Sequence, residues 1–163
     1  MTELVFALEF KGRGGPSGAS PTRRQASTTA PSQIWRTVLN AGTIDTAVQP
    51  VAGDAAVLDS TVERFSDGSF VEAGTIAYGG FGSVSFETVG RGTVGPSPID
   101  GWVHGAVMWT ITGGEGRLAG ARGLITSNFV ASAQGEVVDN QIARLYLPQG
   151  LALQEGVREA SCR

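Results

Sequence analysis

The chain has 163 residues and a mass of 16.8 kDa, which is the size of one globular domain. Hydrophobic residues make up 41% of the chain, so an intrinsically disordered protein is excluded. The net charge of −3 argues against non-specific binding to nucleic acid or to an anionic membrane.

The cysteine and histidine content excludes further classes. Cys162 and His104 are the single residues of their kinds, which excludes a disulfide framework and a Cys/His zinc site. The longest apolar run, from Leu4 to Leu8, has five residues, whereas a membrane span needs roughly 20. The first residues lack the basic start of a signal peptide. We therefore expect a cytoplasmic protein with no nucleic-acid or membrane partner.

Short segments of alternating apolar and polar residues, separated by glycine, predict strands along the whole chain. The first predicted strand spans residues 3–11, and its bulky face carries Leu4, Phe6, Leu8 and Phe10. A loop rich in Gly, Pro and Ser follows at residues 11–21. The further predicted strands span residues 22–30, 33–39, 43–51, 55–66, 69–78, 83–93, 102–112, 121–131 and 136–147.

The connections between these segments predict an antiparallel fold. Asp67-Gly68 joins two alternating runs and is the strongest hairpin signal. Strands at this spacing are typical of a sandwich or a barrel. We favour a closed antiparallel barrel of about eight to ten strands, because the single lysine leaves sheet edges unblocked. One domain is expected over residues 1–150, and residues 151–163 form a tail that could be a short helix.

The predicted strand at residues 102–112 is apolar on both faces. One face carries Trp102, His104, Ala106 and Met108, and the other carries mainly aliphatic residues and Trp109. A strand of a monomeric barrel should show water one polar face. Either the C-terminal segment covers this strand or another subunit does. The second alternative predicts a homo-oligomer, a dimer or trimer.

Residues 111–123 read ITGGEGRLAGARG and close one predicted strand before opening the next. This segment resembles the signature ITGGxGxFxGAxG of the allene oxide cyclase barrel superfamily, and the resemblance extends over roughly residues 83–147. It implies a calycin-like antiparallel barrel of about eight strands with a pocket along its axis, often oligomeric. We interpret the glycines as structural: Gly113 and Gly114 would make a tight turn with positive φ, and Gly116, Gly120 and Gly123 would allow close backbone approach.

The resemblance and the strand pattern suggest two catalytic candidates. Plant allene oxide cyclases have a Glu on the first strand of the barrel, and Glu9 is the nearest positional match. If the bulky face of this strand packs outward, Glu9 points into the lumen, where burial would raise its pKa and suit it to proton transfer. If the bulky face fills the lumen, Glu9 is a surface carboxylate. His104, whose ordinary pKa is near neutrality, is the second candidate.

Other polar and aromatic strand residues are candidates for ligand binding. Glu72 and Glu87 lie on neighbouring predicted strands, where they could form an acid–base pair, remain solvated, or pair with Arg64 or Arg91. Tyr78 and Tyr146 end predicted strands, and an inward Arg144 could bind a carboxylate. The candidate ligand-binding residues are Trp35, Tyr78, Trp102, Met108, Asn140, Arg144 and Tyr146.

These observations lead to one functional prediction and two alternatives. We expect a barrel that binds an apolar small molecule in its lumen and guides its cyclisation or isomerisation without a cofactor, since a shaped, water-excluding pocket needs few polar groups for such chemistry. A Gly-rich phosphate loop would need a helix after residues 113–120, and a strand follows instead. The alternatives are a carrier barrel without chemistry and a filled barrel that serves as an oligomeric assembly module.

Overall fold

The computed structural model describes residues 1–30, 33–50 and 55–148. Within them the chain is almost entirely β-structure, with one short 3-10 turn, η1 (Gly79–Phe81). The strands are β1 (Thr2–Pro16), β2 (Arg23–Ala30), β3 (Gln33–Asn40), β4 (Thr43–Pro50), β5 (Ala56–Arg64), β6 (Ser69–Tyr78), β7 (Gly82–Thr88), β8 (Gly92–Pro96), β9 (Trp102–Gly116), β10 (Arg122–Ser132) and β11 (Glu136–Leu147). The helix proposed for 151–163 lies outside the described residues.

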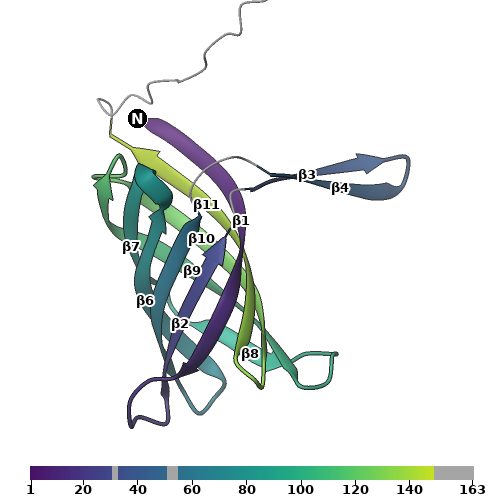
Figure 1. The fold of residues 1–163 in the computed structure, drawn as a ribbon, viewed down its shortest axis with the longest axis vertical. Helices are drawn as coiled ribbons and strands as arrows, with labels where there is room; N and C mark the ends of the chain where they lie inside the picture. Colours follow the sequence, from purple (N-terminus) through teal and green to yellow (C-terminus); the bar gives the residue numbers. More distant parts are fainter. Residues whose placement is uncertain (31–32, 51–54, 149–163) are drawn as a thin grey trace, which may run out of the picture.

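Eight strands close into an antiparallel barrel, which confirms the predicted fold class (Figure 1). Neighbours around the wall follow the order β10, β11, β1, β2, β5, β6, β7 and β9, and β9 pairs with β10 to complete the ring. Closure leaves no long free edge among these strands. The hairpin of β3 and β4 pairs only with itself in the described part of the chain and extends away from the barrel (Figure 1).

One predicted strand, at residues 83–93, is two strands that share a single position in the wall. β7 pairs with the far half of β6 through Ala73 to Ala77, and β8 pairs with its first residues, Ser69 and Phe70. Between them, the Thr88 hydroxyl accepts a hydrogen bond from the Glu72 amide at 2.7 Å and donates one to the Glu72 carbonyl at 2.9 Å. This side chain replaces the missing strand partner, so the β6 backbone stays fixed at Glu72.

β1 is longer than predicted, because the glycines of the expected loop at residues 11–21 extend the strand to Pro16. Gly12 and Gly14 pair with β2 at Thr28 and Ala26. A Cβ atom at Gly12 would collide with the backbone of Ser27 and Thr28, so glycine here permits close strand packing. The glycines thus bring two wall strands together.

The lumen is packed at the end of the barrel where β9 turns into β10. There the Phe86 and Trp109 rings stack at 4.3 Å between centroids, and Leu118 in the connecting turn is 1% exposed. The buried apolar residues of the barrel come from every wall strand, and the largest among the described residues are Trp109, Phe10, Phe86, Ile76, Leu118, Ile125, Leu145, Leu147 and Val84. Burial of these side chains is the main source of stability for the closed wall.

The glycines of residues 111–123 have the structural role that we expected, including close approach at Gly116, Gly120 and Gly123, but the tight turn is not at Gly113 and Gly114. Positive φ occurs at Gly116, Gly120 and Gly123, whereas Gly113 and Gly114 continue β9 as a strand. A Cβ atom at Gly114 would collide with the Leu118 carbonyl, so Gly114 is a close-approach position. The turn therefore forms later in the segment than its first Gly-Gly pair suggests.

No helix in residues 1–30, 33–50 and 55–148 is long and apolar enough to span a membrane.

Candidate functional site

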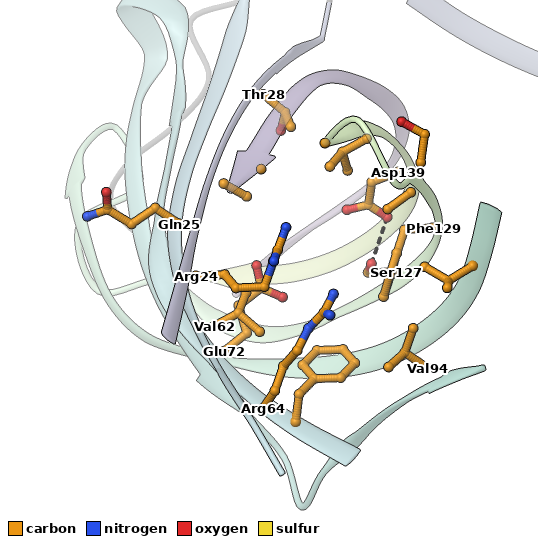
Figure 2. A pocket seen from close by; sticks show the side chains of 18 of the residues that line it. Arg24, Gln25, Thr28, Val62, Arg64, Glu72, Val94, Ser127, Phe129 and Asp139 are labelled. Atoms are coloured by element: carbon orange, nitrogen blue, oxygen red, sulfur yellow. Dashed lines mark hydrogen bonds between the residues drawn. The ribbon is translucent and has the colours of Figure 1, made fainter. Parts of the chain in front are cut away.

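The other half of the lumen is open. A cavity of about 490 Å³ lies between β2, β5 and β6 on one side and β8, β9, β10 and β11 on the other (Figure 2). Its outer rim includes Gly101 and Trp102, from the start of β9, and Ala133 and Gly135, from the β10–β11 turn. The volume is within the range of small-molecule sites. The barrel thus has a packed end and an end with room for a ligand.

Strand alternation places Glu72 in this cavity. On β6, Phe70, Glu72, Gly74 and Ile76 share the inward face, and Glu72 lies opposite Val62 of β5. The Ser60 hydroxyl donates a hydrogen bond to Glu72 Oε1 at 2.5 Å. Burial raises the pKa of Glu72 to about 7, with a further upward contribution from the charge of Asp139. Glu72 therefore exchanges a proton near neutral pH, as a general acid or base should.

Asp139 on β11 is the second carboxyl group in the cavity, and it is held more firmly. The Ser127 hydroxyl donates to Asp139 Oδ1 at 2.6 Å, and Gln141 Nε2 donates to Oδ2 at 2.6 Å. Burial raises the pKa of Asp139, while these two hydrogen bonds and one from the Asn128 amide oppose the rise. Three donors stabilise the ionised form. Asp139 is thus a buried carboxyl group, 6% exposed, whose position is fixed by its hydrogen bonds.

The two carboxyl groups face each other across the lumen. β11 and β6 are four positions apart in the ring of eight strands, so their inward side chains point toward a common centre. Figure 2 shows Glu72 and Asp139 on different walls of the cavity. Because Glu72 accepts one hydrogen bond from a described side chain and Asp139 accepts two, the geometry makes Glu72 the carboxyl that is free to engage a ligand.

Apolar side chains complete the wall. Phe70 of β6 and Phe129 of β10 form an edge-to-face pair with 5.8 Å between ring centroids. Leu58, Val62 and Val94 line the cavity beside them. A ligand in this space would contact apolar and aromatic side chains together with several polar groups, the two carboxyl groups among them.

The bulky face of β1 fills the lumen, so Glu9 lies outside it. Phe10 is fully buried, and Leu4, Phe6 and Leu8 pack against the core. Glu9 points outward and forms an ion pair with Lys11 at 2.7 Å. Of the two alternatives for Glu9, the structure therefore has the surface carboxylate. The lumenal acid lies on β6 instead.

The other predicted site residues are divided between the two faces of the wall. Trp102 lines the cavity rim, and Tyr78 points into the packed half, where its ring contacts Phe6 edge-to-face at 5.1 Å. The side chains on the outer face are His104, Met108, Asn140, Arg144 and Tyr146. The Trp35 side chain lies outside the described part of the structure.

The sequence alternation of β11 also identifies Asp139 as an inward residue, although Asp139 was not among the predicted site residues. On β11 the face with Asp139 also carries Ala143, Leu145 and Leu147, all buried, whereas our candidates followed the opposite face. Three regularly spaced apolar residues near the strand end mark the inward face. The same rule separates Glu72, which is inward, from Glu87, which is exposed on β7, so these two glutamates do not form the acid–base pair considered from the sequence.

No family model, curated protein or solved structure matches the chain. The resemblance of residues 111–123 to the allene oxide cyclase superfamily therefore remains a prediction. Among the described residues, no group of three or more His, Cys, Asp or Glu side chains is arranged to hold a metal ion. The site must therefore be interpreted from its own geometry.

Proposed function

We propose that this barrel binds a small molecule in the open half of its lumen and catalyses its isomerisation or cyclisation by proton transfer through Glu72, without a cofactor. The observation that carries the proposal is a cavity of about 490 Å³ whose apolar wall holds two opposed carboxyl groups, one with a pKa of about 7. A carboxyl group with this pKa, placed in an apolar cleft, is typical of acid–base sites.

The chemistry follows from the different environments of the two acids. The ionised Glu72 carboxylate takes a proton from a C–H bond next to a carbonyl of the ligand. The electron pair of that bond forms a carbon–carbon double bond, and the π pair of the carbonyl moves onto its oxygen. The resulting Glu72 acid then returns the proton to another carbon of the conjugated system, which shifts the double bond and restores the carboxylate. The charge of Asp139 on the opposite wall raises the proton affinity of Glu72.

Native mass spectrometry of protein purified from its own source tests the binding step. We expect a co-purifying small molecule, and we expect incubation with the extracted molecule to yield an isomer of equal mass. Glu72→Gln should lower that turnover by about 100-fold or more, because the base is lost. Glu87→Gln is the matched control, since Glu87 is exposed on the outer face of β7.

The outcomes separate the proposal from its alternatives. Equal turnover in the Glu72→Gln and Glu87→Gln variants would contradict the catalytic role. A bound molecule that is never converted would favour the carrier barrel. The absence of any ligand, together with no thermal shift across a panel of small molecules, would contradict lumenal binding itself.

The predicted homo-oligomer has a separate test. Val5, Met108, Leu124 and Ile142 are exposed on neighbouring strands of the outer face, which also carries the ion pair between Glu3 and Arg144. Both charge signs on one apolar face allow it to pack against a second copy. We expect native masses of two or three subunits, and dissociation to one in an Ile142→Lys variant. A single-subunit mass for the unmodified protein would contradict this prediction.

A further inference from the structure

Two arginines from adjacent strands line the open cavity. Arg24 on β2 lies opposite Val62 of β5, and Arg64 follows Val62 by two residues on the same face of β5. Diagonal positions of this kind are about 7–8 Å apart, within reach of long side chains. Figure 2 shows both guanidinium groups directed into the cavity. Two positive charges thus lie together in a partly enclosed space.

The two guanidinium groups have no hydrogen-bond or ion-pair partner among the described side chains, although partners exist for other arginines. The neighbouring Arg23 points outward and lies 3.8 Å from a Glu63 carboxylate oxygen. Arg91 contacts Asp67 at 3.4 Å. Burial and the charge of Arg24 both lower the pKa of Arg64. The folded protein therefore keeps two like charges close together, and neither forms an ion pair with a carboxylate of the described residues.

We propose that Arg24 and Arg64 bind the anionic group of the ligand, so that the molecule held in the lumen is an organic acid. This inference rests on the proposed function, because it names the class of molecule that occupies the same cavity. Guanidinium groups bind carboxylates and phosphates through paired N–H donors, and such charged hydrogen bonds are roughly twice as strong as neutral ones. An anion between the two arginines would also relieve their mutual repulsion.

The rest of the cavity indicates what the acid carries. Thr28, 2% exposed, lines the same cavity, and its hydroxyl has no hydrogen-bond partner within the described residues. Phe70 and Phe129 supply an aromatic wall. The ligand would therefore combine an anionic end at the arginines with an apolar or aromatic body and a polar atom within reach of Thr28. This arrangement fixes the orientation of the ligand relative to Glu72.

Three probes with one aromatic body test the inference: naphthoate, naphthyl phosphate and naphthol. Binding to the full-length protein is measured by isothermal titration near neutral pH, where naphthol is uncharged. We expect at least one anion to bind about tenfold or more tightly than naphthol, because charged hydrogen bonds are gained. The tighter of the two anions identifies whether the natural group is a carboxylate or a phosphate.

Variants show where the anion binds. Arg24→Gln and Arg64→Gln should each weaken binding of the anion about tenfold while leaving the affinity for naphthol unchanged. Arg64→Lys keeps the charge and should weaken it less. Arg23→Gln is the control and should have no effect, since Arg23 faces away from the cavity. Circular dichroism tests whether each variant is folded. If a glutamine variant is unfolded, the affinity of Arg64→Lys for the anion replaces it as the test.

The possible results distinguish this inference from the proposed function. Equal affinity for naphthol and both anions would overturn the anion site while leaving lumenal binding in place. Failure of all three probes to bind would overturn the inference and also count against lumenal binding. If Arg23→Gln weakens anion binding as much as Arg64→Gln does, the anion binds on the outer surface. That result would also overturn the inference.

Discussion

Replacing Glu72 with glutamine is expected to make the barrel more stable than the wild type at about pH 8. The pKa of Glu72 is about 7 in the folded protein, against its ordinary value of 4.5. Between these values the folded state binds more protons than the unfolded state, so the free energy of unfolding of the wild type falls as pH rises. Glutamine removes the contribution of Glu72 to this dependence and should add about 3 kcal/mol above pH 7.

Urea denaturation at a series of pH values between about 4 and 8 measures this effect. The wild type should lose stability across the interval, and the Glu72→Gln variant should lose less. A slope of the same sign should remain, because burial also raises the pKa of Asp139. Arg24 and Arg64 line the same cavity as the two carboxyl groups and stay positive throughout this pH range.

Glu87→Gln is the matched control for this experiment. Glu87 lies opposite Ala73, one residue along from Glu72, but on the exposed face of the wall. Its replacement removes the same charge from the protein without removing a buried carboxylate, so its pH profile should follow that of the wild type. Parallel profiles for the two variants would show that the lumen does not perturb Glu72.

A gain in stability on loss of Glu72 would also bear on function. The Glu72 carboxyl group would then destabilise the folded state near neutral pH. Glutamine could replace it in folding, because glutamine can still accept the Ser60 hydrogen bond. Residues that cost stability and are nevertheless present often belong to functional sites. The combination of higher stability and lower turnover in Glu72→Gln would therefore support the catalytic role directly.

The closed barrel could be predicted from the sequence because period-two alternation is a local property. Phe6, Phe10, Ile125 and Leu145 each follow the alternation of their own strand, and all point into the lumen. The turn at Asp67-Gly68 was also predictable: Gly68 has φ of 80°, and the Asp67 carboxylate accepts hydrogen bonds from Ser69. Such features depend on a few neighbouring residues.

The site could not be predicted in the same way, because it depends on which strands face each other. Glu72 and Asp139 are brought together by the closure of the ring, and they are 67 positions apart in the chain. The face of a strand that points inward is also a property of the whole barrel. On β11 the residues predicted from the sequence, Asn140, Arg144 and Tyr146, lie on the outward face. Asp139 and Gln141 lie on the inward face instead.

The largest effect of a single methyl group is expected at Gly123. This residue is the second of β10 and lies opposite Leu145 of β11, and its φ is 145°, a conformation that side chains disfavour. A Cβ atom there would collide with the carbonyl oxygen of Arg144. Because backbone is rigid on both sides, Gly123→Ala should lower the free energy of unfolding by about 2–4 kcal/mol, as measured in urea.

Gly95→Ala separates this effect from a general intolerance of alanine. Gly95 lies in β8, has no positive φ, and would place its Cβ atom in open space. Its replacement should change stability by less than about 1 kcal/mol. Similar losses in the two variants, or a Gly123→Ala variant as stable as the wild type, would contradict the packing of β10 against β11. Gly123 does not line the cavity. A destabilised but folded Gly123→Ala variant should therefore bind naphthoate with unchanged affinity. That result would show that this glycine stabilises the wall of the barrel and does not take part in ligand binding.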